Sequence, residues 1–232
     1  MLGGSIAREA LRGCGLFGNA DEPTLDALAA ALRIRRFRKA ETVFHQGDPG
    51  DALFIVASGS VKVVLPSDEG AEPAIVALLG PGEFFGELAI LDGAPHSATI
   101  VAIEPTETLV LHRDAFLALI DSEPALRRAL LASLATEIRR LTGHVEDLHF
   151  LDLPGRLASR ILRLSVECEP DPDGAIRISW PYTQSELAGM IGGSRQSVNR
   201  LLANLAEEGL VRIEHDVLVV TDRERLALTV ER

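Results

Sequence analysis

The chain has 232 residues, of which 47% are hydrophobic and 25% charged, a composition that supports about two folded domains with sizeable cores. No run of 18 apolar residues occurs, and charges fall within the first 15 residues where a signal peptide has its apolar core, so we expect a cytoplasmic protein without a membrane span. Two cysteines are too few for a disulfide framework or an iron–sulfur cluster, and the net charge of −11 argues against general adhesion to nucleic acid.

Short apolar segments separated by glycines dominate the first half of the chain. Eight of the 20 glycines fall between Gly47 and Gly93. The β-branched runs between and after them are typical of strands in a sandwich, jelly roll or barrel. The preceding segment, 16–32, has helical spacing, with Asp21 and Thr24 as candidate caps. The candidate strands are residues 52–57, 60–65, 74–79, 97–102 and 108–112.

A long helix is predicted after a short one at 114–120. Helical sequence continues without interruption from Pro124 to about His149. Its apolar residues are spaced 3, 4, 3, 4 and 3 positions apart, and polar residues flank them, which is the pattern of a coiled-coil seam. We therefore expect a dimer. The alternative is a helix packed on its own domain, which usually carries a wider apolar stripe. The expected dimer interface consists of Leu131, Leu134, Ile138, Leu141, Val145 and Leu148.

Two short helices joined by a glycine turn are predicted near the C-terminus. The first spans 183–191 and begins with a capping-box sequence. Gly192-Gly193 form the turn, and Ser194 caps a second helix to about residue 208. The outer, N-terminal part of the second helix carries the residue types that read base edges in a major groove. A helical oligomerisation domain is the alternative. The expected DNA-binding residues are Thr183, Ser194, Arg195, Gln196, Asn199 and Arg200.

The sequence around this helix pair supports a DNA-binding domain. Pro154-Gly155 interrupts the long helix, an acidic loop is expected at 167–174, and a strand at 175–179. A hairpin at 211–220 has the pattern of a wing. Between residues 194 and 206 the only charged residues are two arginines, so positive charge is confined to one face of an acidic chain.

Two motifs point to a protein family. The segment Phe85-Gly-Glu-Leu-Ala89, followed by Ser97-Ala-Thr99, resembles the phosphate-binding cassette of cyclic-nucleotide domains. The segment Gly192-Gly-Ser-Arg-Gln-Ser-Val-Asn-Arg200 resembles the recognition-helix signature of CRP/FNR bacterial transcription regulators. The resemblance extends from about Leu16 to Leu226 and implies an α+β chain. Its expected parts are a jelly-roll effector domain at 1–122, a dimerisation helix and hinge at 123–150, and a winged helix-turn-helix domain at 151–232.

The resemblance implies a homodimeric, sequence-specific DNA-binding transcription regulator, not an enzyme. Its implied partners are a second copy, RNA polymerase and double-stranded DNA with a two-fold symmetric site related to TGTGA–TCACA. Cyclic AMP or another cyclic nucleotide, a different small effector, and a pocket that no longer binds cyclic nucleotide all stay open. A jelly-roll metalloenzyme would need clustered ligands, whereas the six histidines include no His-x-His pair, so we expect neither a metal nor an iron–sulfur cluster.

The cassette has a chemical logic and two departures from cyclic-AMP-binding relatives. Gly86 permits close backbone approach to an anion, Glu87 can accept a hydrogen bond from a ribose hydroxyl, and Ser97 can donate to a phosphate oxygen. The relatives carry a phosphate-pairing arginine where this chain has His96, which lacks a permanent charge. They carry an adenine-contacting threonine where this chain has Leu141. The expected ligand-binding residues are Gly86, Glu87, Leu88, Ala89, His96, Ser97, Leu141 and Thr142.

Overall fold

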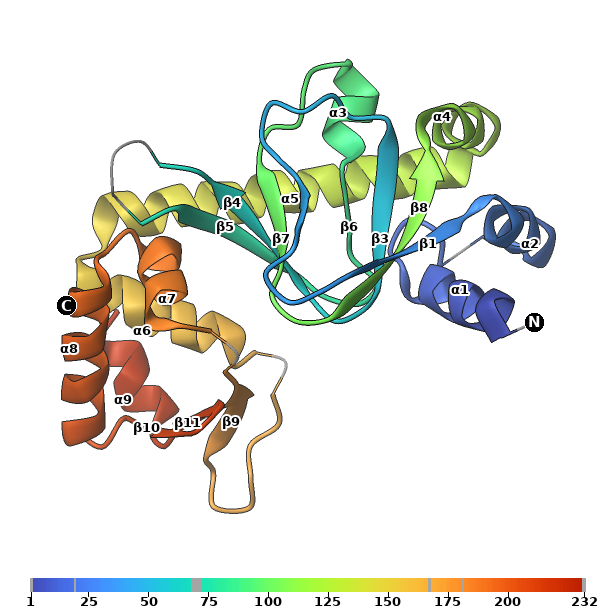
Figure 1. Ribbon diagram of the computed structural model, residues 1–232. Coiled ribbons are helices and arrows are strands. Elements are labelled where there is room, and N and C mark those ends of the chain that lie inside the picture. The colour runs from blue at the N-terminus through green and yellow to red at the C-terminus, as the bar shows by residue number, and fades with distance from the viewer. Residues whose placement is uncertain (1, 19, 68–71, 167, 181, 231–232) are drawn as a thin grey trace. The chain divides into compact units, whose positions relative to one another are not determined.

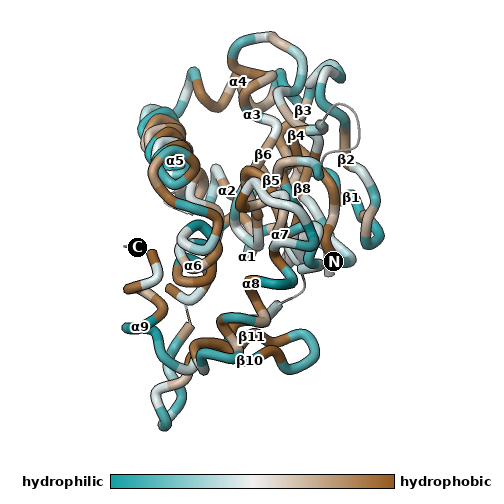
Figure 2. Tube along the Cα trace, turned by 90° about the vertical axis from the view of Figure 1, so that its left-hand side faces the viewer, coloured by the Kyte–Doolittle hydropathy of each residue, from teal (hydrophilic) through white to brown (hydrophobic). Residues whose placement is uncertain are grey.

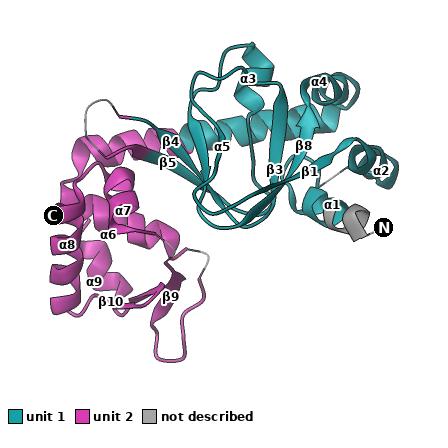
Figure 3. Ribbon diagram, in the orientation of Figure 1, with its two compact units in different colours: residues 1–66, 75–139 teal, residues 67–74, 140–232 magenta. Residues whose placement is uncertain are grey.

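A computed structural model describes residues 2–18, 20–67, 72–166, 168–180 and 182–230 of the chain. The chain forms two compact units, residues 1–66 with 75–139 and residues 67–74 with 140–232 (Figure 3). The first unit contains two four-stranded sheets with helices around them, and the second contains a three-stranded sheet with helices (Figure 1). This confirms the predicted α+β class.

The two sheets of the first unit have the strand connectivity of a jelly roll. One sheet has the order β1-β8-β3-β6 and the other the order β2-β7-β4-β5, so strands that are distant in sequence pair in space. The strands are β1 (Arg33–Phe37), β2 (Thr42–Phe44), β3 (Ala52–Ser58), β4 (Val61–Leu65), β5 (Ala74–Leu79), β6 (Phe84–Phe85), β7 (Thr99–Ala102) and β8 (Thr106–His112).

Strands β3 and β8 are buried on both faces, which explains their continuous apolar runs. Phe54 and Val110 belong to the core between the two sheets. Leu53 and Leu109 belong to a second core, which the helices cover. Because successive side chains point to opposite faces of a strand, both faces need apolar residues here. The helices of this unit are α1 (Leu2–Gly13), α2 (Glu22–Ala31), α3 (Glu87–Asp92), α4 (Arg113–Ser122) and the first part of α5 (Pro124–Phe150).

The N-terminal region differs in part from the sequence prediction. The helix expected at 16–32 begins only at Glu22, because Asp21 caps it by accepting a hydrogen bond from the Thr24 nitrogen at 3.0 Å. Thr24 therefore lies inside α2 and is not its cap. The sequence does not predict α1, β1, β2 or β6. Strand β1 exposes four of its five residues, so it has no alternation of buried and polar positions to detect.

The second unit is built on α6 and a small sheet. The predicted break at Pro154-Gly155 lies within the first turn of α6, where proline is well tolerated, and Asp152 caps that helix by accepting from the Gly155 nitrogen at 2.8 Å. Glu167, the first residue of the predicted acidic loop, lies outside the described residues. The sheet has the order β10-β11-β9. The elements are α6 (Leu153–Leu164), β9 (Ile176–Ser179), α7 (Gln184–Ile191), α8 (Arg195–Glu207), β10 (Val211–Glu214), β11 (Val217–Val220) and α9 (Arg223–Leu228).

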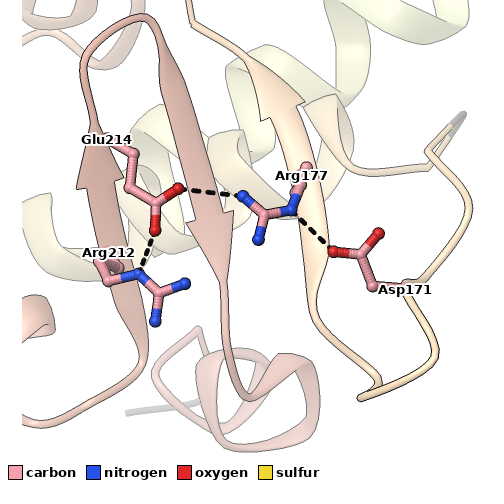
Figure 4. A network of polar contacts seen from close by, with 4 residues as sticks. All are labelled: Asp171, Arg177, Arg212 and Glu214. Atoms are coloured by element: carbon pink, nitrogen blue, oxygen red, sulfur yellow. Dashed lines mark hydrogen bonds and ion pairs between the residues drawn. The ribbon is translucent and has the colours of Figure 1, made fainter.

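A chain of ion pairs crosses one face of this sheet (Figure 4). Arg177 of β9 donates to Asp171 at 2.7 Å and to Glu214 of β10 at 3.0 Å, and Arg212 donates to the other oxygen of Glu214 at 2.5 Å. Arg177 and Arg212 both lie opposite Val219 of the central strand, so their side chains share a face. The hydrogen bonds from Arg212 and Arg177 lower the pKa of the Glu214 carboxyl.

Candidate effector pocket and DNA-reading helix pair

The cassette turns sharply between β6 and α3, and Gly86 makes this turn. Its φ of 89° lies in the left-handed region that favours glycine. A Cβ at this position would also come within 2.7 Å of the carbonyl oxygen of Ala52. Glycine is therefore required both by the backbone conformation and by the space available, and it brings the first turn of α3 close to β3.

His96 is held beneath this turn. The side chain is only 7% exposed and stacks on Phe44, with ring centroids 3.5 Å apart and an angle of 6° between the rings. The backbone nitrogen of His96 donates to the backbone carbonyl oxygen of Asp48, and the carbonyl oxygen of His96 accepts from the backbone nitrogen of Gly47, both at 2.9 Å. A Cβ on Gly50 would lie 2.9 Å from the imidazole Cε1, so the loop packs tightly on the ring. His96 is a fixed, buried group.

The titratable groups of the pocket carry no permanent positive charge. Burial lowers the pKa of His96, and the nearby charges of Asp48 and Asp51 oppose this shift only in part. Its imidazole is therefore largely neutral near pH 7. Glu87 is half-buried, and burial, with a contribution from the charge of Glu137, raises the pKa of the Glu87 carboxyl. Neither His96 nor Glu87 supplies a fixed positive charge.

The glycine turn and Glu87 fit a cyclic nucleotide, whereas His96 is a poor substitute for an arginine that pairs with the phosphate. The glycine turn and Glu87 are compatible with a phosphate and a ribose. His96 could donate one hydrogen bond to a phosphate oxygen but lacks the fork of an arginine. When bound, a cyclic nucleotide would supply a negative phosphate, and His96 could offset its charge by taking up a proton.

The remaining predicted ligand-binding residues occupy different environments. Ala89 is buried, and Leu88 is exposed on α3. Ser97 is exposed before β7. Leu141 and Thr142 are exposed on the part of α5 that belongs to the second unit. The sequence offered no signal for Phe44 or Gly50, because their roles depend on contacts with a residue some fifty positions away.

The helix pair of the second unit is closed by capping groups. The Thr183 hydroxyl accepts from the Glu186 nitrogen at 3.2 Å, and the Glu186 carboxylate accepts from the Thr183 nitrogen at 2.8 Å, completing a capping box. Gly192, with φ 68°, ends α7, and Ser194 caps α8 by accepting from the Ser197 nitrogen at 3.1 Å. Thr183 and Ser194 are thus occupied as caps. The buried side chains that join the helices include Leu187, Met190, Ile191, Val198 and Leu202.

The first two turns of α8 present a polar face. Arg195, Gln196, Asn199 and Arg200 are exposed, as predicted from their spacing. The side-chain oxygen of Asn199 accepts a hydrogen bond from the Gln184 amide of α7 at 3.2 Å. This contact joins the two helices and uses the oxygen of the Asn199 amide as an acceptor. Gln184 has no place in the predicted site, since only the folded helix pair brings it next to Asn199.

Helix α5 exposes an apolar stripe over most of its length, and apolar and polar residues alternate along it in Figure 2. Leu131 is 66% exposed, and Ile138 and Val145 are each 64% exposed. Leu141 and Leu148 are exposed to a smaller degree, at 39% and 44%. Leu134 differs, because it is half-buried against the core of the first unit. Five of the six predicted seam residues are therefore open to solvent in the single chain.

Comparison with known proteins identifies the family. Residues 34–123 match the cyclic nucleotide-binding domain, and residues 155–229 match the Crp-like helix-turn-helix domain. A CRP-like cAMP-activated global transcriptional regulator of Mycobacterium tuberculosis is 35% identical over 94% of this chain and 97% of its own length. The chain belongs to the CRP/FNR family of transcription regulators. The cyclic AMP receptor protein of Thermus thermophilus is 36% identical to this family member, over 88% of this chain and 90% of the relative.

Solved structures of CRP/FNR proteins share its fold. The catabolite activator protein of Thermus thermophilus covers 94% of this chain at 34% identity, with a TM-score of 0.53 over 98% of that chain. FixK2 of Bradyrhizobium japonicum, at 22% identity, has a TM-score of 0.75 over 85% of this chain and 96% of its own. In the described ranges of this CRP/FNR chain, no helix combines the length and the apolarity needed to cross a membrane.

Proposed function

We propose that this CRP/FNR regulator acts as a homodimer through α5. The observation that supports this is the exposed stripe of Leu131, Ile138, Leu141, Val145 and Leu148, whose spacing matches a coiled-coil seam. Large apolar side chains that repeat along one helix face are costly to leave in water. The N-terminal part of the same helix is covered differently, because Leu126 and Leu130 pack in the core of the first unit.

The dimer would bind a two-fold symmetric DNA site related to TGTGA–TCACA and act with RNA polymerase in the cytoplasm. Arg195 and Arg200 would each hold a guanine, and Gln196 would read the neighbouring base pair. Asn199 has its side-chain oxygen engaged by Gln184, so it would offer hydrogen-bond donors to the DNA. The two recognition helices must lie about 34 Å apart to enter successive major grooves.

A small effector in the cassette pocket would control DNA binding. The tight Gly86 turn above a buried imidazole is the observation that supports a phosphate-type ligand, and relatives are named for cyclic AMP. The alternative is a pocket that has lost cyclic nucleotide, favoured by His96 and by Leu141. An effector can shift the DNA-binding equilibrium only through its different affinities for the two states. We also propose three functional segments: an effector domain at 1–122, a dimerisation helix and hinge at 123–150, and a DNA-binding domain at 151–232.

Two measurements test the proposal. Calorimetric titration of the full chain with cyclic AMP and cyclic GMP decides whether the pocket binds either nucleotide; saturable binding that Glu87→Ala weakens is expected. Selection of random duplex DNA by the purified protein should return a two-fold symmetric motif. An asymmetric motif, or none, would remove the dimeric regulator from consideration, whereas absent nucleotide binding alone would leave the other effectors.

A further inference from the structure

Arg160 of α6 is a half-buried cation whose Nε lacks a hydrogen-bond partner. Its Nε is buried and has no hydrogen-bond partner, and the guanidinium makes no ion pair with any residue that the structure describes. Burial lowers the pKa of this arginine. Arginines removed from water are normally paired, because the loss of hydration otherwise goes uncompensated. The Nε of this half-buried guanidinium therefore still requires a hydrogen-bond acceptor, and an anion that also contacts the terminal nitrogens would supply it.

The groups around Arg160 are mainly positive. The charges of Arg140 and Arg163 add to the lowering of its pKa, and only Tyr182 opposes it. His144 of α5 lies in the same cluster, since burial and the charge of Arg160 lower its pKa. All five groups belong to the second unit of a chain with a net charge of −11. The cluster is thus a local basic site and not part of a generally basic surface.

The one acid among the groups that shift these pKa values is already engaged. Asp147 of α5 accepts from Arg163 at 2.7 Å and from the Ser159 hydroxyl at 3.3 Å. It therefore neutralises Arg163 and ties the last turns of α5 to α6, while Arg160 donates no hydrogen bond to it. The cluster lacks an anion for its most desolvated arginine.

We propose that Arg160 is the centre of an anion site at the junction of α5 and α6 that takes a phosphate group. A planar guanidinium offers parallel donors to two phosphate oxygens, and neighbouring cations favour an anion of more than one charge. Because Arg140 and His144 lie on α5 whereas Arg160 and Arg163 lie on α6, a bound phosphate would brace the bend between these helices. Free phosphate compounds and the DNA backbone present the same chemistry.

Thermal unfolding of the full chain tests the free-phosphate source. Inorganic phosphate, compared with chloride of equal ionic strength, should raise the Tm of the wild type by roughly 2–4 °C and to saturation. Arg160→Gln should abolish this rise. Arg223→Gln, which removes the same charge from an exposed position on α9, should retain it. In chloride, Arg160→Gln should be at least as stable as the wild type, since it removes an unpaired, half-buried charge.

The salt dependence of binding to a TGTGA–TCACA duplex tests whether the phosphate comes from the DNA backbone. This second experiment rests on the proposed function. If a DNA phosphate occupies the site, Arg160→Gln should reduce the slope of log K against log salt by about one, and Arg223→Gln should not. A rise in Tm with phosphate that Arg160→Gln leaves intact would overturn the proposal. The absence of both results, a phosphate-dependent rise in Tm and an altered salt slope, would also overturn the proposal. A large loss of stability of Arg160→Gln in chloride would do the same.

Discussion

At the scale of single residues, His96 decides what the pocket can bind. Its position in the cassette motif is evident from the sequence, but its chemistry depends on burial against Phe44 and on the tight approach of Gly50. A solvent-exposed histidine would titrate near pH 6.5, whereas burial lowers the pKa of this one. An anionic ligand must therefore supply the energy that protonates it.

Affinity for cyclic AMP should rise as pH falls. The free protein holds His96 neutral because its pKa is lowered, and a bound phosphate raises that pKa, so binding takes up a proton. Because the pKa of the free protein is lowered, the increase should continue below the ordinary histidine value of about 6.5. His96→Arg should strengthen binding roughly 10- to 100-fold at pH 8, as expected of a charge-assisted contact, and flatten the pH dependence. Titration calorimetry of both proteins at pH 6 and 8 measures this, and a tight, pH-independent wild type would contradict it.

Base preference should depend on Gln196. The family resemblance implies that regulators reading TGTGA half-sites carry glutamate at this position. Glutamate accepts a hydrogen bond from cytosine N4, whereas glutamine pairs well with adenine. The selected site should therefore resemble TGTGA–TCACA with an altered base pair facing Gln196. Gln196→Glu should restore the TGTGA preference, and Arg200→Ala should cost about 1–3 kcal/mol of discrimination. Recovery of unaltered TGTGA by the wild type would refute only the role of Gln196.

At the scale of elements, helix α5 changes its environment along its length. Its first turns pack on the jelly roll, and the turns that follow expose the heptad stripe. The sheet of β9, β11 and β10, which we call the wing sheet, also has one specialised face, because the ion-pair network lies across it (Figure 4). Each element therefore serves the packing of its own unit while leaving one surface for another role.

Placing a charge in the seam should dissociate the dimer. Ile138→Glu would bring two unpaired carboxylates into an apolar interface and should raise the dimer Kd by at least about 100-fold, roughly 2.7 kcal/mol. Thr136→Glu, exposed on the same helix outside the stripe, is the matched control and should leave the Kd unchanged. Sedimentation equilibrium distinguishes the two. An unchanged Ile138→Glu dimer would restore the alternative of a helix that packs only on its own unit.

The wing should lose order in acid. Arg212 and Arg177 lower the pKa of Glu214 in the folded state, so its ion pairs stabilise the sheet above the pKa of the unfolded carboxyl, about 4.3, and are lost as pH falls through the lower folded value. Amide hydrogen exchange in β10 and β9 should therefore accelerate below about pH 4. Glu214→Gln should show faster exchange at pH 7 and little further change in acid, whereas an acid response equal to the wild type would show that other groups cause it.

At the scale of the whole molecule, the sequence by itself determined the class, the family and the main elements. Heptad spacing, glycine punctuation and the capping box are local signals, and they predicted α5, most of the jelly-roll strands and the helix pair of the DNA-binding unit. The exposed face of α8 followed from helical periodicity alone, because residues three and four positions apart share a side.

Only the tertiary structure decided which groups meet. The stack of His96 on Phe44, the bond from Gln184 to Asn199 and the unpaired Arg160 beside Arg163 depend on distances between separate elements. Strand β1 escaped prediction because its exposed, arginine-rich residues carry no periodic signal, and its partner β8 lies more than 60 residues away. Local sequence encodes backbone preference and amphipathic faces. Burial, which lowers the pKa values of His96 and Arg160, arises only when distant segments pack together.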